Sequence, residues 1–245
     1  MKEALVLLPG MMCDARVFGP QISTLSAECP VMVAPVHGGD RIEEIASDLL
    51  DTLPRKFAVA GLSMGGIVAL ELLRRAPDRV SRIALMSTTS LAETPQSAAD
   101  YEPVITKLKA GLLDQAVTSM ISVDHLAPGP SRNSILHLLA SMADNLGAEA
   151  LIRQARALQR RRDYQATLRQ CHVPAMLVCG AADTLTPVKH HEFMAGLIPQ
   201  AELAMIAEAG HFPTLEAPEA VIAAFRAWMR QPMVLSRKID ATAPV

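Results

Sequence analysis

The sequence predicts an α/β fold in which a mostly parallel sheet is flanked by helices and interrupted by an inserted helical cap. Short apolar runs alternate with helical patterns along most of the 245 residues, which is typical of strands joined by crossover helices. Several runs are apolar throughout, as expected for parallel strands buried on both faces. Hydrophobic residues make up 50% of the chain, enough for a large core.

The expected elements follow this alternation in order. Six strands are predicted at residues 4–8, 31–36, 57–60, 83–86, 175–179 and 203–206. A helix is expected at 42–53, with Asp40 as its N-cap and Glu43 completing a capping box, and it ends before Pro54. Further helices are expected at 66–76, 188–197 and 218–229.

Between residues 88 and 169 the alternation stops, and helical patterns appear at 101–113, 114–123, 131–145 and 148–160. We interpret this segment as a cap over the carboxyl ends of the strands, where open α/β sheets bind ligands. The expected organisation is a core formed by residues 1–90 and 171–231, a helical cap at 91–170, and a C-terminal tail at 232–245.

Composition and charge narrow the class of protein. The formal net charge of −2 and the pI near 6.4 offer no basis for nucleic-acid binding, so a small-molecule substrate is expected. No apolar stretch approaches the roughly 18 residues of a membrane span, and the first apolar run meets Pro9 too early for a signal peptide. We therefore predict a cytoplasmic protein, without membrane partners, that is a monomer or homodimer.

The four cysteines show no C-x-x-C spacing and are expected to be reduced, mostly buried thiols. They are Cys13, Cys29, Cys171 and Cys179.

A G-x-S-x-G motif places Ser63 between the strand at 57–60 and the helix that follows. This setting is typical of a nucleophile on a sharp strand-to-helix turn, where Gly61 and Gly65 avoid Cβ clashes. The alternative is an ordinary strand-turn-helix junction. We predict that Ser63 is a catalytic nucleophile.

A serine nucleophile needs a base and a carboxylate that orients the base. Among seven histidines, His211 directly follows the last expected strand, so it should emerge at the same sheet edge as Ser63. Asp183 also follows the end of a strand, although aspartate commonly serves in turns and N-caps as well. The chain order Ser63, Asp183, His211 matches a known catalytic triad.

The chain resembles the α/β-hydrolase superfamily, specifically its cap-bearing carboxylesterase and 3-oxoadipate enol-lactonase-like branch, and the resemblance implies the α/β-hydrolase fold. It covers nearly the whole chain and rests on residues 8–11 (LPGM), 61–66 (GLSMGG), 76–80 (APDRV), 180–183 (GAAD) and 209–211 (AGH). In the cap the resemblance weakens to helical character alone.

The oxyanion of a tetrahedral intermediate needs two backbone donors. One is expected at Met64, directly after the nucleophile at a helix N-terminus, and the other in the loop after the first strand. The resemblance maps that second donor to Met11. Many members of the family have histidine where this chain has Pro9, so the anchoring of the first loop must differ.

Several further residues allow two interpretations each. Met12 and Phe212 are candidates for the substrate pocket, although methionine often only fills a core. Arg153, Arg156 and Arg160 share one face of an expected helix, which is either solvated or able to bind an anionic substrate or a carrier protein. The pair His190 and His191 lacks partners at metal-ligand spacing, so no metal and no cofactor are expected.

We therefore predict a serine hydrolase that cleaves a small ester, thioester or lactone through an acyl-enzyme on Ser63. Hydrolysis of a carbon–carbon bond and perhydrolysis remain alternatives for the same triad. A different class of protein, a small-molecule receptor that retains a slow triad, is also compatible with the motifs.

Overall fold

A computed structural model describes residues 3–232, so the tail predicted at 232–245 lies almost wholly outside the described residues. Six strands form one sheet in the order β2-β1-β3-β4-β5-β6, and every neighbouring pair is parallel. The predicted α/β fold is thereby confirmed. The strands are β1 (Leu5–Leu8), β2 (Val31–Val33), β3 (Phe57–Leu62), β4 (Val80–Met86), β5 (Ala175–Gly180) and β6 (Ala201–Ile206).

Two strands differ by three residues from their sequence patterns, whereas β3 and β6 differ by two and β1 and β5 by one. The second strand, predicted at 31–36, ends at Val33, because Pro35 has no N–H to continue the ladder. The fourth strand begins at Val80 rather than at 83. The prediction began too late because Ser81 and Arg82 interrupt the apolar pattern. Both polar side chains are buried because they bond to the carboxylate of Glu3.

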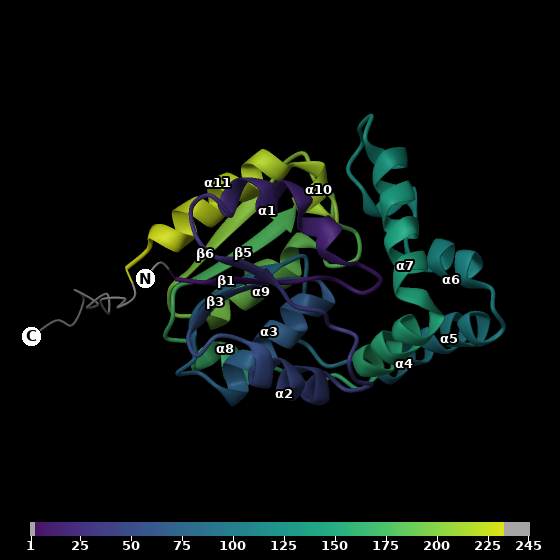
Figure 1. Cartoon of the computed structure of the whole chain (residues 1–245), viewed down its shortest axis with the longest axis horizontal. Coiled ribbons are helices and arrows are strands. Elements are labelled where there is room, and N and C mark those ends of the chain that lie inside the picture. The colour runs from purple at the N-terminus through teal and green to yellow at the C-terminus, as the bar shows by residue number, and fades with distance from the viewer. Residues whose placement is uncertain (1–2, 233–245) are drawn as a thin grey trace, which may run out of the picture.

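Helices cover both faces of the sheet (Figure 1). One face carries α1 (Gly19–Leu25) and α11 (Pro218–Arg230), and the other α2 (Ile42–Thr52), α3 (Met64–Arg75), α8 (Gln165–Arg169) and α9 (Val188–Leu197). The short α10 (Pro213–Glu216) contacts α1, α11, β5 and the 3-10 turn Ala15–Phe18. The sequence pattern did not predict α1, α8 or α10, which are each seven residues or shorter.

The predicted cap of α2 is wrong. The N-cap residue is Arg41, and it makes no side-chain cap hydrogen bond. The carboxylate of Asp40 instead forms an ion pair of 2.7 Å with Arg160, which lies 120 residues further along the chain. A capping pattern is local, whereas this contact exists only in the folded protein.

The core lies on both faces of the sheet. In β1, Leu5 and Leu7 belong to the cluster beneath α1 and α11, while Val6 and Leu8 belong to the cluster on the opposite face. This alternation follows from the period of two residues along a strand. Every residue of β1, β3, β4 and β5 is buried, as the apolar patterns of β1, β3 and β5 predict, and β4 also buries Ser81 and Arg82.

No disulfide joins the cysteines within residues 3–232, and three of the four cysteines are buried. Burial raises the pKa of the Cys171 thiol, and it raises the pKa of the Cys179 thiol to about 12. These buried thiols stay protonated at neutral pH and are weak nucleophiles.

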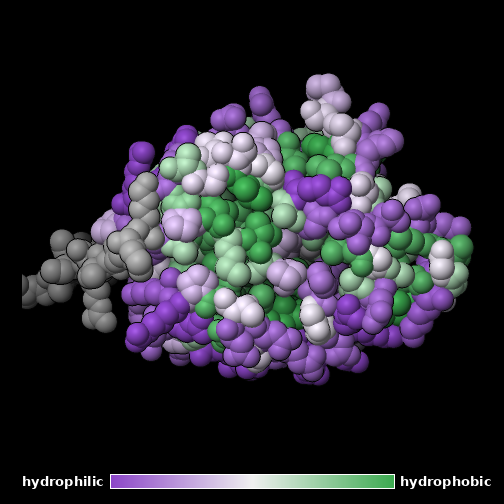
Figure 2. All heavy atoms as spheres, in the orientation of Figure 1, coloured by the Kyte–Doolittle hydropathy of each residue, from purple (hydrophilic) through white to green (hydrophobic). Residues whose placement is uncertain are grey.

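Between β4 and β5 the chain forms only helices, most of which gather at one end of the sheet (Figure 1, teal), whereas the short α8 packs on the face of the sheet. We call residues 91–170 the insert. Its main helices are α4 (Pro95–Ala99), α5 (Tyr101–Lys109), α6 (Leu113–Met120) and α7 (Arg132–Gln159). Figure 2 shows hydrophobic residues gathered over part of the insert as well as over the sheet, within an otherwise hydrophilic face.

Helix α7 joins the two helices predicted at 131–145 and 148–160. The helix is broken at Gly147, whose φ of 78° and ψ of 163° are not helical. By length and composition alone α7 could cross a membrane, and 33% of its apolar window is buried. Its residues Leu139, Met142 and Leu151, however, are buried in the hydrophobic core of the protein. We therefore interpret α7 as a packed helix of the insert, and the cytoplasmic location stays a prediction.

The strand order brings two loops together at the carboxyl edge of the sheet. The chain moves from β1 outward to β2 and then returns to β3 on the other side of β1, which creates the switch point where open α/β sheets bind ligands. Leu8 at the end of β1 pairs with Gly61 of β3. The loop after β1 and the turn at Ser63 are therefore neighbours.

The two motif glycines make this close packing possible. A Cβ atom on Gly65 would lie 2.1 Å from the carbonyl oxygen of Leu8, and one on Gly61 would lie 2.2 Å from that of Gly65. Only glycine permits such approach of backbone to backbone. The first turn of α3 consequently sits directly on the end of β1.

Candidate active site

Ser63 occupies a strained turn between β3 and α3. Its φ of 51° and ψ of −116° are unusual for a residue with a side chain. Its N–H donates to the carbonyl of Met86 at 2.8 Å, and its carbonyl accepts from the Thr88 hydroxyl at 2.7 Å. Such strain persists only where neighbouring groups hold it and commonly marks functional sites.

The structure brings His211 and Asp183 together. The Nδ1 atom of His211 lies 3.1 Å from each carboxylate oxygen of Asp183, and the two residues are only 3% and 5% exposed. Because Nδ1 faces a carboxylate, it carries the proton and leaves Nε2 as an acceptor. The imidazole thus has the tautomer that a general base needs.

Asp183 is fixed by further donors from its own loop. One oxygen accepts from the N–H groups of Leu185 and Thr186, both at 2.9 Å, and the other accepts from the Thr186 hydroxyl at 2.7 Å. Burial alone would raise the pKa of Asp183, but the bonds from His211 and Thr186 outweigh it and lower the pKa to about 2. The carboxylate is therefore charged throughout the neutral range.

This lowered pKa predicts a loss of stability in acid. Because the folded pKa of Asp183 is about 2 and the ordinary value is 3.8, its contribution is complete above about pH 4 and disappears as pH falls toward 2. The shift corresponds to about 2 kcal/mol of unfolding free energy. Urea unfolding of the wild type and of Asp183→Asn, compared at pH 5 and pH 2.5, should show the difference between them shrinking in acid. An unchanged difference would contradict the prediction.

The loop that carries His211 is held by Glu216, a residue that the sequence analysis missed. The Glu216 carboxylate accepts from the N–H groups on both sides of the histidine, Gly210 and Phe212, each at 2.9 Å. It also accepts from Ala127 of the insert at 2.7 Å, and the N–H of His211 itself donates to the His125 carbonyl at 2.8 Å. The insert therefore helps to hold the loop of the histidine.

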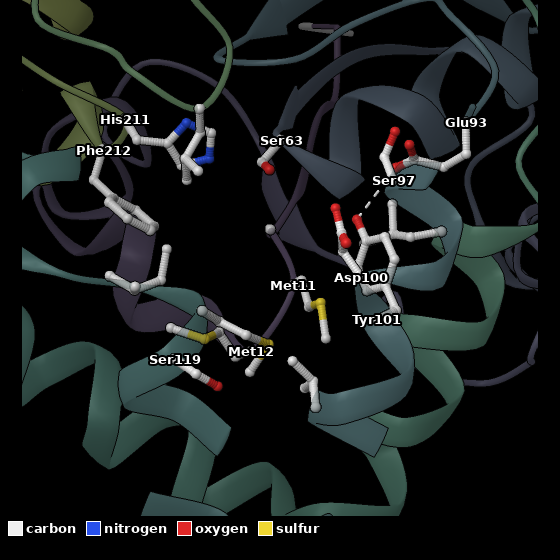
Figure 3. A pocket seen from close by; sticks show the side chains of 16 residues that line it. Met11, Met12, Ser63, Glu93, Ser97, Asp100, Tyr101, Ser119, His211 and Phe212 are labelled. Atoms are coloured by element: carbon white, nitrogen blue, oxygen red, sulfur yellow. Dashed lines mark hydrogen bonds between the residues drawn. The ribbon is translucent and has the colours of Figure 1, made fainter. Parts of the chain in front are cut away.

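Ser63 and His211 line the same cavity, which has a volume of about 370 Å³. Figure 3 shows Ser63 between His211 and Phe212 on one side and the first helices of the insert on the other. No hydrogen bond joins these two described side chains, Ser63 and His211. Catalytic hydrogen bonds are commonly long in ligand-free sites and shorten when substrate binds.

The cavity walls combine the core and the insert. Met12 and Phe212, the predicted pocket residues, both line the cavity, as does Met11. The insert adds a polar wall that was not predicted, formed by Glu93, Ser97, Asp100 and Tyr101 (Figure 3). The remaining lining residues are Gly10, Val104, Ser119, Met120, Ile121, Leu158 and Leu185.

Two backbone N–H groups are placed as candidate oxyanion donors. Met64 is the first residue of α3, so its N–H has no acceptor within the helix and lies at the positive end of the helix dipole. The Met11 N–H donates to no acceptor in the described part of the protein. The next N–H, that of Met12, is already occupied by the side chain of Gln154 at 2.9 Å.

The arginine row of α7 is engaged in ion pairs within the protein. Arg153 bonds to Glu149 and to the carbonyl of His37, Arg156 pairs with Glu102, and Arg160 pairs with Asp40. Their side chains are between 26% and 45% exposed. The row therefore joins the insert to neighbouring segments rather than forming a freely solvated face.

His191, the second of the two adjacent histidines of α9, lies in the interior of the protein. His191 is fully buried, and its Nε2 accepts from the Thr88 N–H at 3.2 Å, while burial lowers its pKa to about 4. It therefore acts as a neutral hydrogen-bonding group behind the end of β4. Residues 3–232 contain no group of three or more His, Cys, Asp or Glu side chains that could hold a metal ion.

Comparison with known proteins gives consistent results. A protein-family model described as the alpha/beta hydrolase fold matches residues 39–218. The pimeloyl-[acyl-carrier protein] methyl ester esterase of Aromatoleum aromaticum is 31% identical over 241 residues, covering 88% of this chain and 93% of that protein. The protein of the same name from Nitrosomonas europaea is 26% identical and covers 91% of this chain and 94% of its own.

Solved structures share the same architecture. A thermophilic esterase from Thermogutta terrifontis superimposes with a TM-score of 0.84 at 25% identity, covering 94% of this chain and 90% of the other. The enol-lactonase from Burkholderia xenovorans LB400 gives a TM-score of 0.83 at 21% identity, covering 94% and 92%. Because its identity is only 21%, the similarity to the enol-lactonase shows a shared fold alone.

Proposed function

Since the chain belongs to the α/β-hydrolase family, and is therefore a hydrolase, we propose that it cleaves a carboxylic ester through an acyl-enzyme on Ser63. The observation that carries this proposal is the buried His211–Asp183 pair at the cavity that Ser63 also lines. A neutral imidazole oriented by a carboxylate is the base that a serine hydroxyl requires.

The first half of the reaction forms the acyl-enzyme. The Ser63 hydroxyl oxygen attacks the ester carbonyl carbon while its proton passes to Nε2 of His211. The negative charge on the former carbonyl oxygen is held by the N–H groups of Met64 and Met11. The carbon–oxygen bond to the alcohol then breaks, and the alcohol leaves with the proton from His211.

The second half releases the acid. A water molecule gives a proton to His211 and attacks the acyl carbon, which forms a second tetrahedral intermediate on the same two N–H donors. The bond to Ser63 then breaks, and the serine oxygen recovers the proton from His211. Asp183 stays charged throughout and stabilises the imidazolium that forms in each half.

For the substrate, we propose an ester whose acyl chain is attached to an acyl-carrier protein, as the names of the two esterase relatives state for those proteins. The cavity of about 370 Å³ lies within the range of small-molecule pockets. Its mostly apolar walls suit an aliphatic chain, and the polar wall of Glu93, Ser97, Asp100 and Tyr101 suits a more polar portion of the substrate.

Labelling with a fluorophosphonate tests the nucleophile, and a substrate panel tests the reaction. We expect a single adduct on the peptide that contains Ser63, found by mass spectrometry after digestion. The panel compares p-nitrophenyl butyrate, a thioester, a lactone and a methyl ester on an acyl-carrier protein. Cleavage of the esters supports the proposal, whereas labelling without turnover of any substrate, together with a large thermal shift on ligand binding, favours a receptor.

The role of the carrier protein is tested by comparing the rate of hydrolysis of the same methyl ester when it is free and when it is attached to the carrier. Carrier proteins are acidic, so recognition through basic side chains would make the rate on the carrier-linked ester fall as salt is raised. The rate on the free ester should change little. Equal kcat/KM values for the two substrates, at all salt concentrations, would remove the carrier from the proposal and leave the esterase activity intact.

A further inference from the structure

One buried side chain of the insert reaches the loop that follows β1. Gln154, in the second half of α7, is fully buried, and its Oε1 accepts a hydrogen bond of 2.9 Å from the backbone N–H of Met12. Its Nε2 donates over 3.5 Å to the carbonyl of Val36, just beyond β2. Gln154 thus joins the insert to the ends of two neighbouring strands.

The backbone that Gln154 contacts is strained. Met12 has a φ of 58° and is only 2% exposed, so its conformation is unusual and its N–H is shielded from water. A buried N–H without an acceptor costs about 1 to 3 kcal/mol. By accepting this hydrogen bond, Gln154 stabilises the strained turn, which the Cys13 N–H also closes by donating to Gly10 at 3.2 Å.

Met11 lies within this turn and faces the cavity that Ser63 lines (Figure 3). Peptide units are planar, so fixing the Met12 N–H fixes the plane between Met11 and Met12 and limits how the preceding N–H can rotate. Pro9 carries no polar side-chain group, and so the side-chain anchor of this turn comes from the insert. Gln154 is the residue that provides it.

We propose that Gln154 is a positioning residue, which holds the turn of residues 10–12 so that the Met11 N–H points at the oxyanion. This inference rests on the proposed function, because the Met11 N–H has a catalytic use only if an oxyanion forms beside Ser63. Gln154 itself touches no reacting atom. It extends the role of the insert from lining the cavity to setting the geometry of the reaction.

The test uses Gln154→Met, which keeps the side-chain length and removes the acceptor. Misplacing an oxyanion donor weakens transition-state stabilisation more than substrate binding. We therefore expect kcat on p-nitrophenyl butyrate to fall about 10- to 100-fold, with KM changed less than threefold. Affinity for a trifluoromethyl ketone, whose adduct with Ser63 carries the same oxyanion, should fall by a similar factor.

Two further variants separate positioning from folding. Gln154→Glu keeps an acceptor oxygen at the same place and should recover most of the lost kcat. Gln159→Met removes a glutamine of the same helix that bonds only within the insert, and it should leave kcat within twofold of the wild type. Rates are expressed per active site titrated with fluorophosphonate, so that a partly unfolded sample does not imitate an effect on catalysis.

Unchanged kcat in Gln154→Met, or an equal loss in Gln159→Met, would overturn the inference. If Gln154→Met does not fold, Gln154→Asn, whose oxygen is withdrawn by one methylene group, must show the same loss of inhibitor affinity. If the wild type cleaves no ester, the proposed function fails. Hydrogen exchange at the Met12 amide, slow in the wild type and fast in Gln154→Met, then decides separately whether Gln154 holds the turn.

Discussion

Replacing Ser63 with alanine should lower kcat on p-nitrophenyl butyrate by roughly 10³- to 10⁶-fold, as removal of the nucleophile does in other triads. The alanine side chain has no oxygen to form the acyl-enzyme, so only the oxyanion donors and substrate binding continue to accelerate hydrolysis. The strained φ of 51° disfavours alanine about as much as serine, since both carry a Cβ atom. The variant should therefore fold and still bind substrate.

The measurement is steady-state kinetics together with a thermal melt of each protein. Ser134→Ala, which changes an exposed serine whose hydroxyl bonds only to the Ser131 carbonyl within the insert, is the matched control and should retain full activity. Loss of the fluorophosphonate adduct should accompany the loss of turnover. Full activity in Ser63→Ala would show that the nucleophile is elsewhere.

Replacing Asp183 with asparagine should lower kcat by roughly 10⁴-fold, by analogy with the same change in serine proteases. Both carboxylate oxygens lie 3.1 Å from Nδ1 of His211, and asparagine can present an NH₂ group there instead. The imidazole would then turn to the other tautomer, with its proton on Nε2, where it cannot accept the proton of Ser63. KM should change little, because Asp183 does not line the cavity.

Asp163→Asn is a suitable control for this variant. Asp163 is an exposed aspartate that accepts from the N–H two residues ahead at 2.9 Å, as Asp183 does with Leu185. If Asp183→Asn lowered activity only by disturbing this kind of turn, Asp163→Asn would lower activity as well. A loss of less than tenfold in Asp183→Asn would mean that another group orients His211.

The fold was predictable because β1, β3 and β5 are buried on both faces and read as unbroken apolar runs. Ser63 and Asp183 follow β3 and β5, whereas His211 follows the partly exposed edge strand β6. Parallel strands place their carboxyl ends at one edge of the sheet. The placement of these three residues at the same sheet edge therefore follows from local sequence patterns and sheet topology. The largest errors at strand ends have local causes: Pro35 stops the ladder after β2, and Ser81 and Arg82 interrupt the apolar pattern of β4.

The supporting residues could not be predicted in this way. Gln154 meets Met12 across 142 positions of sequence, and Asp40 meets Arg160 across 120, so no local spacing relates them. Glu216 is nearer, five residues after His211, yet its role depends on where the short α10 turns its carboxylate. Amphipathic periodicity locates the helices of the insert but not the side chains that they direct toward the core.

The break at Gly147 has a consequence for protein engineering. Because the insert lines the cavity, an obvious way to alter substrate preference is to exchange it between relatives as a single module, with its ends at the termini of β4 and β5. The half of α7 beyond Gly147 carries Arg153 and Gln154, whose bonds reach the loops that follow the first two strands of the core. A chimera that replaced this half would also replace Gln154, which bonds to the turn of residues 10–12. The glycine marks a better crossover point, with the donor sequence ending there and the native helix continuing after it.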